Sequence, residues 1–396
     1  MDVDDEARTI GRRLRQIRNS RKKSLRVVAG LAGMSKSHLS EIERGECALD
    51  RRSEIVALAD VLQVAPSELI GLPVPAPGNG HTDTAVKVVR RALAAVSRNR
   101  PGGQVLPVEP LRARVKAVLV DERQCRYAEV GAALPVLIRD LHASIAAGRD
   151  VAELLDLAAL LHTQGSHEWL MIMGASLDLR SLATLLARQA AERRDEPTTM
   201  GLAVFGDVLV MLAEGDFDLA RDELDSMTVP TNTPQSAQLA GMLALSHSLV
   251  AAADRRPADV VAALEHAAEL ARHTGEGNAY SLGFGPTNVG LWRMATVLEA
   301  GDHPRAVAIA ESLRPELHPN LSRRSMYWTD YGRALARVRG REKDAVLAFR
   351  RAEVISPLMV RNPYAREVLA ELVVRSRRDA AGRELRGMAY RAGLLV

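Results

Sequence analysis

The chain has 396 residues, a formal net charge of +4, and a composition that is 47% hydrophobic but only 3% aromatic. Its length fits two domains, or one domain followed by an extended array, and its abundance of Ala, Leu, Val and Arg predicts mostly α-helix. The two cysteines are far apart and have no CxxC spacing, so they give no indication of disulfides or of a zinc site. The sequence shows no leader and no long apolar run, and we therefore expect a cytoplasmic protein with no membrane contact.

Positive charge is concentrated near the amino terminus. Between Arg8 and Arg52 the sequence holds thirteen Lys or Arg residues against four acidic ones, while the rest is near neutral or acidic. Such a local excess attracts the phosphates of nucleic acid at long range. A charge run of this kind is also common on a solvated helix face, so charge alone leaves both interpretations open.

The stretch from Leu25 to Arg44 predicts two short helices joined by a tight turn. Ser24 is a good N-cap for the first helix, in which we expect Val28 and Leu31 to face inward. Gly33 then supplies the positive φ that the corner requires.

The second short helix has its own start and stop residues. Ser35 is the expected N-cap, Leu39 and Ile42 lie three apart on one face, and Gly45 follows at a position that favours the left-handed conformation. Ala29 is small where the two helices must approach closely. The pattern predicts two helices that meet at a steep angle.

This pattern resembles the helix-turn-helix of the phage-repressor, or xenobiotic-response-element, family of transcription factors. The resemblance covers about residues 8–72, including the segment SEIERG, and the flanking segments 10–21, 52–64 and 66–72 fit the other helices of the five-helix family fold. It implies that the pair Arg18 and Glu43 is structural. A helical hairpin with another use is the alternative.

The resemblance implies which residues contact DNA, since the second helix of this motif lies in the major groove. Lys36, Ser37 and Glu41 would face bases, with His38 and Ser40 beside them. Ser35 and Arg44 would meet phosphates. Many relatives have Gln where this chain has Leu25, so Arg26 is expected to take over that backbone contact. The assigned DNA-binding residues are Arg26, Ser35, Lys36, Ser37, His38, Ser40, Glu41 and Arg44.

A segment rich in proline and glycine follows and divides the chain. We assign residues 1–72 to the DNA-binding domain, 73–84 to a linker that is not helical, 85–147 to connecting helices and 148–396 to a helical-repeat domain.

Four segments in the second half share one layout of helix, polar turn and second helix. Their turns, at Gly215, Arg255, Gly301 and Gly340, are 40, 46 and 39 residues apart. The layout resembles a tetratricopeptide-type array with a longer period, which predicts an all-α fold whose second part is an α-solenoid. Two further helix pairs are expected within 150–194, and one within 363–395.

Such an array has a concave surface on which peptides or small ligands bind. Asn288 and Trp292 lie four apart and share a helix face, and Tyr327 and Tyr331 repeat that spacing one unit later. Aromatic residues at this spacing also form ordinary helix cores, so both interpretations stay open. The candidate ligand-binding residues are Asn288, Trp292, Arg293, Tyr327, Tyr331 and Asn362.

The whole arrangement resembles the RRNPP quorum-sensing regulators, in which a short peptide binds the concave face and alters a dimer. The resemblance implies a homodimeric regulator of transcription that binds double-stranded DNA at a partly palindromic operator and responds to a peptide or small-molecule ligand. The alternative is an adaptor that is tethered to DNA and binds a partner protein. The sequence contains no phosphate-binding GKS or GKT, no HExxH and no GxSxG, so we expect neither enzyme activity nor a cofactor or metal.

Overall fold

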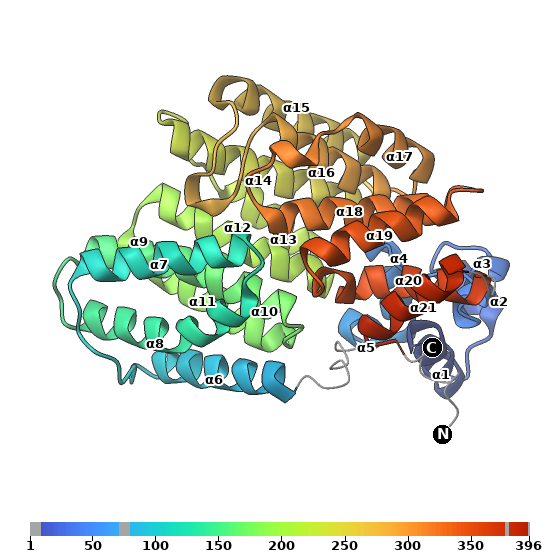
Figure 1. The fold of residues 1–396 in the computed structure, drawn as a ribbon, viewed down its shortest axis with the longest axis horizontal. Helices are drawn as coiled ribbons and strands as arrows, with labels where there is room; N and C mark the ends of the chain where they lie inside the picture. The colour runs from blue at the N-terminus through green and yellow to red at the C-terminus, as the bar shows by residue number, and fades with distance from the viewer. Residues whose placement is uncertain (1–8, 71–79, 377–379, 395–396) are drawn as a thin grey trace.

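The computed structural model describes residues 9–70, 80–376 and 380–394, and all regular structure within these ranges is helical. It confirms an all-α, helical-repeat fold with a helix-turn-helix domain at the amino terminus (Figure 1). We call residues 9–70 the head and residues 80–394 the body.

The head is a compact group of short helices around one small core. Its helices are α1 (Thr9–Ser20), α2 (Leu25–Leu31), α3 (Lys36–Glu43), α4 (Arg52–Leu62) and α5 (Pro66–Ile70). Gly11 lets α1 approach α3, because a β-carbon at this position would lie 2.1 Å from the carbonyl oxygen of Ile42. The buried residues Leu14, Val28 and Leu39 complete the contact among the first three helices.

The predicted corner between α2 and α3 is confirmed. The Ser24 side chain accepts a hydrogen bond from the Val27 amide at 3.3 Å, and Ser35 accepts one from the His38 amide at 3.1 Å. Gly33 has φ 70° and Gly45 has φ 71°, in the left-handed region that a side chain rarely adopts. Both helices therefore begin and end where the sequence indicates.

The prediction that Leu31 faces inward is wrong. Its side chain is 66% exposed and lies on the same side of α2 as Val27, which is also exposed. The inner face of this short helix is formed by Val28 and Ala29, with Ala32 directly after it. Three small or medium side chains already fill the space against α3, which leaves Leu31 outside.

The first part of the body is a bundle with one continuous core. Its elements are α6 (Gly80–Ser97), α7 (Val108–Arg123), α8 (Tyr127–Ala146), α9 (Val151–Leu160), the π-helical segment η2 (Leu161–His167), α10 (Glu168–Ile172) and α11 (Leu177–Arg194). A single hydrophobic cluster joins them from Val89 to Ala190, so the expected boundary after residue 147 runs through one core.

Two expectations for this region need correction. Helix α6 begins at Gly80, so residues 80–84 of the expected linker are helical, and residues 73–79 lie outside the described ranges. Residues 150–194 form one helix pair and not two, because α9, η2 and α10 follow one another without a break as one long helix. This helix contains Gly165 but no proline, and a single glycine within a helix does not necessarily end it.

The remaining body consists of five consecutive helix pairs. They are α12 (Pro197–Glu214) with α13 (Phe217–Ser226), α14 (Pro234–Ala253) with α15 (Pro257–Thr274), α16 (Pro286–Glu299) with α17 (His303–Ser312), α18 (Leu321–Ala336) with α19 (Glu342–Ile355), and α20 (Pro363–Arg375) with α21 (Ala380–Arg391). Single 3₁₀ turns, η3 (Ala279–Ser281), η4 (Pro315–Leu317) and η5 (Met359–Arg361), lie between pairs. Ala220, Ala306 and Ala345 are fully buried at the helix crossings, as the repeat pattern predicts.

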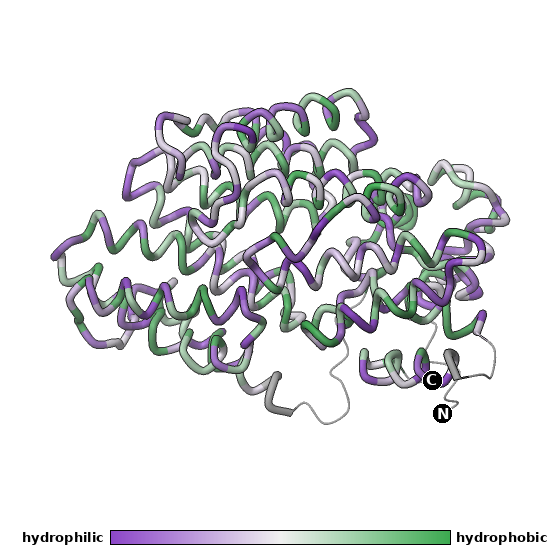
Figure 2. The backbone as a smooth tube through the Cα atoms, turned by 45° about the horizontal axis from the view of Figure 1, so that its top comes forward, coloured by the Kyte–Doolittle hydropathy of each residue, from purple (hydrophilic) through white to green (hydrophobic). Residues whose placement is uncertain are grey.

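Hydrophobic residues are distributed through all layers of the body rather than gathered at one end (Figure 2). Two helices, α12 and α14, are long and apolar enough to cross a membrane by length and composition alone. In the structure 61% and 83% of these stretches are buried, which is the behaviour of core helices. The composition of α12 and α14 is therefore weak evidence for a membrane span.

Candidate nucleic-acid interface and ligand cavity

Helix α3 lies at the outer edge of the molecule, with α2 beside it (Figure 1). Ser35, Lys36 and Ser37 are exposed at its start, while Ser40 and Glu41 are half-buried one turn later. Arg26 is exposed on α2. The residues with assigned base contacts therefore share one accessible surface, which we call the recognition surface.

Arg44 is also exposed but is engaged within the head. Its guanidinium donates to both carboxylate oxygens of Glu46, at 2.8 and 2.6 Å, and to the hydroxyl of Ser40. About half of each charged side chain remains exposed, so water and salt screen this pair. Such a pair is weak enough for a phosphate to replace Glu46 as the partner of Arg44.

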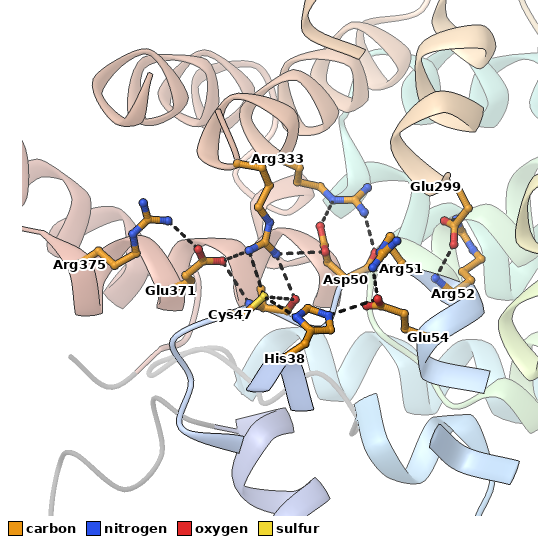
Figure 3. Close-up of polar contacts among 12 residues, drawn as sticks. His38, Cys47, Asp50, Arg51, Arg52, Glu54, Glu299, Arg333, Glu371 and Arg375 are labelled. Carbon is orange, nitrogen blue, oxygen red and sulfur yellow. Dashed lines mark hydrogen bonds and ion pairs between the residues drawn. The ribbon is translucent and has the colours of Figure 1, made fainter. Parts of the chain in front are cut away.

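His38 differs from its assignment beside the bases. Its Nε2 lies 3.3 Å from a carboxylate oxygen of Glu54, and its Nδ1 lies 3.8 Å from the sulfur of Cys47. The ring therefore points toward α4 and the loop before it (Figure 3). This position follows from helix periodicity, since His38 lies one turn before the buried Ile42.

Part of the positive charge of the head has a structural use. Arg18 forms a two-pronged ion pair with the buried Glu43, at 2.5 and 2.9 Å, as the family resemblance implies. Arg13 donates to the carbonyl of Leu69. The exposed positive charge around α3 is therefore smaller than the number of Lys and Arg residues between Arg8 and Arg52 suggests.

The head is docked on the body through a row of buried polar contacts (Figure 3). Asp50, in the loop before α4, pairs with Arg333 and with Arg337, each at 3.3 Å, and its own carbonyl accepts from Arg333 at 2.7 Å. Burial acts to raise the pKa of Asp50, but the charges of Arg337 and Arg333 outweigh it and lower that pKa below its ordinary value. Asp50 is therefore ionised and held by two arginines of α18 and its C-terminal end.

A second carboxylate of the body binds the start of α4. Residue Arg51 occupies the N-cap position and provides no side-chain cap. Glu299 of α16 takes this role instead: its carboxylate accepts from the amides of Arg52 and Ser53, at 2.5 and 3.3 Å, and pairs with the Arg52 guanidinium at 3.0 Å. A negative charge at a helix N-terminus also interacts favourably with the helix dipole. The body therefore caps a helix of the head.

A third carboxylate, Glu371 of α20, completes the row. It accepts from the Ala48 amide at 3.1 Å and pairs with Arg337 at 2.5 Å and Arg375 at 2.8 Å. Arg337 in turn donates to the carbonyl of Ala48 at 3.0 Å. Both backbone groups of Ala48 are thus held by body side chains.

The turns of the repeat pairs also face the head. A β-carbon placed on Gly215 would lie 2.6 Å from Val56, and one on Gly301 would lie 2.6 Å from the guanidinium of Arg51. The guanidinium of Arg255 similarly lies 3.8 Å from the β-carbon position of Gly33, at the corner between α2 and α3. Three of the four turns identified in the sequence therefore lie against the head.

A large cavity, with a volume of about 1040 Å³, lies between the head and the body. The first helices of the five repeat pairs all contribute to its wall, as expected for the concave side of a solenoid. The head contributes Arg52 of α4 together with Ser67, Glu68 and Ile70 of α5. Arg52 also lies over the ring of Tyr364, another wall residue, with 5.0 Å to the ring centroid. The volume is at the upper end for sites that bind small molecules.

Three of the six candidate ligand-binding residues line this cavity. Asn288, Trp292 and Asn362 do so, and the first two share a face of α16 as expected. Arg293 is exposed elsewhere on α16. We find that the assignments of Arg293, Tyr327 and Tyr331 are not supported, since none of them lines the wall.

The two tyrosines occupy a different face of α18. Tyr327 is buried and its hydroxyl donates to the carbonyl of Ala310, while Tyr331 donates to Glu311. They pack against α17, whereas the cavity face of α18 is formed by Arg323, Met326, Asp330 and Arg333. The i, i+4 aromatic spacing here belongs to the core, which is the alternative that the sequence left open.

The residues that join head and body were not predicted from the sequence. Asp50, Glu299, Arg333, Arg337 and Glu371 are far apart in sequence, and no local motif connects them. One indication was present, because α4 has arginine where a helix normally has Ser, Thr, Asp or Asn as its N-cap. A missing local cap predicts a partner from elsewhere but does not identify it.

In a comparison with known families, residues 9–69 match a family described as a helix-turn-helix domain. No curated protein matches the chain. No solved structure matches it either. The residues, the geometry of α2 and α3 and the family match agree that the amino-terminal part of this chain is a helix-turn-helix domain of a DNA-binding regulator.

Proposed function

We propose that this protein is a cytoplasmic, homodimeric, sequence-specific regulator of transcription whose operator affinity responds to a ligand in the cavity between head and body. One observation carries the proposal: Arg52, from a helix of the DNA-binding head, is part of the cavity wall. A molecule bound there would touch the head directly. No long pathway between ligand and DNA-binding domain is needed.

The coupling follows from residues that both line the cavity and hold the head. Glu299 caps α4, Arg333 holds Asp50, and both line the wall. A ligand that binds Glu299 or Arg333 in place of the head weakens head docking. A ligand that packs against these side chains and keeps them in position strengthens it. By linkage, a ligand that prefers one placement of the head shifts the population toward it and changes operator affinity.

The dimer follows from the limited reach of one recognition helix, which reads few base pairs. Two-fold symmetry doubles the site and places two half-sites about one helical turn, ~34 Å, apart or at a multiple of it. We expect a partly palindromic operator and a dimer in sedimentation experiments. A footprint with a single unrepeated site would contradict the dimer.

Selection of bound sequences from random oligonucleotides with the full chain tests sequence-specific binding. We expect one enriched, repeated motif, and we expect Lys36→Ala to relax the preference at one base position, because a good side-chain–base pairing discriminates by about 1–3 kcal/mol. Lys343→Ala, which removes an exposed lysine from α19, is the matched control. An even loss of affinity over all sequences, or no DNA binding at low ionic strength, would refute the proposal.

The alternative of an adaptor that binds a partner protein has less support. A partner protein needs a broad accessible surface, whereas Asn288 and Trp292 lie in a cavity that the head helps to cover. Their placement favours a small ligand or short peptide. The adaptor would be favoured if no small ligand changed the operator affinity and if the body stably bound a partner protein.

A further inference from the structure

The wall of the cavity contains an arginine that has no acidic partner. Arg323 of α18 donates through Nε to the Asn288 side chain at 3.1 Å, and its guanidinium lies over the ring of Trp292, with 5.1 Å to the ring centroid. Among the described residues it forms no ion pair, and its two terminal nitrogens have no hydrogen-bond partner. The Asn288 amide and the Trp292 ring therefore hold the Arg323 guanidinium in place, but neither of them neutralises its charge.

Arg180 of α11 is in the same situation. Its Nη2 lies 3.3 Å from Nε2 of His167, and no described carboxylate forms an ion pair with it. Its Nε is buried without a partner. Burial lowers the pKa of Arg180 to about 10 and also lowers that of Arg323, so the surroundings of both groups disfavour the positive charge.

Glu168 is a carboxylate whose charge acts on both arginines, although Asp330 acts more strongly on Arg323 and Glu214 acts more strongly on Arg180. It pairs with a third arginine, Arg123, at 3.2 Å, and its charge also acts on Arg180 and Arg323. Arg123 has a second acid beside it, Glu122, at 2.9 Å. Burial raises the pKa of Glu122 above its ordinary value, so its surroundings disfavour the negative charge. The wall as a whole carries nine Lys or Arg residues against six Asp or Glu residues, so positive charge is in excess among the described wall residues.

Unpaired hydrogen-bond donors lie along the same wall. Among the described residues, no acceptor lies within hydrogen-bond distance of Nε1 of the buried Trp292, Nε2 of the buried Gln164 or Nε of Arg123. Buried donors without a partner are rare and costly in folded proteins. Both carboxylate oxygens of Glu122, on the same wall, also lack a hydrogen-bond partner among the described residues, so it is the excess of guanidinium groups that favours an anion here.

One part of the wall is apolar and adaptable. Met171, Phe205, Leu209, Met242 and Met326 line it. Unbranched thioether side chains adjust to ligands of irregular shape. A fully polar anion such as free phosphate would leave these side chains uncovered, whereas a molecule with an apolar part would cover them.

We propose that the cavity binds an amphipathic organic anion, whose carboxylate or phosphate group interacts with the guanidinium groups of Arg180 and Arg323 and whose apolar part lies along the methionine-rich wall. This inference names the ligand class for the proposed function and rests on its ligand-sensing part. Guanidinium groups bind both kinds of anion through paired N–H donors. The anion would be the missing counter-charge of the arginine cluster.

Calorimetric titration of the full chain with three eight-carbon probes tests this inference. The probes are octanoate, octyl phosphate and octanol, which share one apolar chain and differ in charge. We expect at least one of the two anions to bind at least tenfold more tightly than octanol, and the comparison between the anions distinguishes the two head groups. Equal affinity for all three probes would overturn the proposal, and this comparison uses only the unaltered protein.

Variants then locate the anion. Arg323→Gln and Arg180→Gln are expected to reduce anion affinity at least tenfold and to leave octanol affinity unchanged. Arg305→Gln, which removes an exposed arginine from α17, is the matched control. Arg323→Lys keeps the charge without the planar donors and is expected to bind with intermediate affinity. Unchanged anion affinity in folded Arg323→Gln and Arg180→Gln proteins would refute the site.

Operator binding is measured on the same preparations, so that the two proposals fail separately. A protein that binds DNA but no anion would refute this inference and leave the regulator intact. A protein that binds the anions through Arg180 and Arg323 but ignores DNA would refute the proposed function and leave the anion site standing.

Discussion

Replacing Glu299 by alanine should loosen the head from the body. Its carboxylate, which is almost fully buried, accepts from two α4 amides and pairs with Arg52. Loss of a helix cap costs about 0.5–2 kcal/mol, and breaking a fully buried ion pair costs about 3–5 kcal/mol. Because the Arg52 side chain remains 25% exposed toward the cavity, water compensates part of the second loss. We expect a combined effect of about 3 kcal/mol on docking, or roughly a 150-fold shift toward undocked heads.

Hydrogen exchange measures this shift at named amides. The Arg52 and Ser53 amides lose their acceptor directly, so their exchange reports on capping alone. The Ala48 amide is bound to Glu371 and not to Glu299, so faster exchange there reports on undocking of the whole head. We expect all three to exchange about 100-fold faster in Glu299→Ala.

Glu265→Ala, an exposed change on α15, is the control for this experiment and should leave all three amides unchanged. If Arg52 and Ser53 lose protection while Ala48 keeps it, the carboxylate caps a helix but does not secure docking. That result would refute the link between Glu299 and head placement on which the coupling mechanism depends.

Three further predictions concern stability. Gly11→Ala should lower the midpoint of chemical denaturation of the head, because the new β-carbon would lie 2.1 Å from a carbonyl oxygen of α3, and an unchanged midpoint would contradict this packing. Leu31→Ser should leave thermal stability nearly unchanged, whereas Val28→Ser should lower it by several degrees; equal effects would contradict the observed orientation of α2. Burial lowers the pKa of His142 to about 4 and that of His162 well below its ordinary value. Below pH ~6.5 the unfolded chain therefore binds more protons than the folded chain, and the free energy of unfolding should fall from there toward pH 4. Thermal melts at pH 7 and pH 5 should show a smaller difference in His162→Gln than in the unaltered protein.

The helix-turn-helix was predictable because its determinants are local. Ser24, Gly33, Ser35 and Gly45 fix the ends of two helices through hydrogen bonds and backbone angles within a few residues. Leu31 was not predictable from periodicity, since a seven-residue helix offers too few positions to define its buried face. In short helices the neighbouring side chains decide which face is covered.

The repeat turns of the body were predictable for the same reason, but the cavity was only partly so. Asn288 and Trp292 line the wall as expected, while Tyr327 and Tyr331 pack against α17. Helix spacing identifies residues that share a face but not the neighbour that this face meets. The arginine cluster was missed because Arg180 and Arg323 come from helices that are distant in sequence.

The cap on α4 means that the DNA-binding unit is not bounded by the chain segment that encodes it. Residue Glu299, which follows Arg52 by 247 positions, supplies the acceptor for the first amides of this helix. A truncated fragment ending near residue 70 would begin α4 at an uncapped arginine and would fray there. Chimeras that transplant the amino-terminal segment onto another scaffold would inherit the same defect unless an acidic side chain is engineered at the junction.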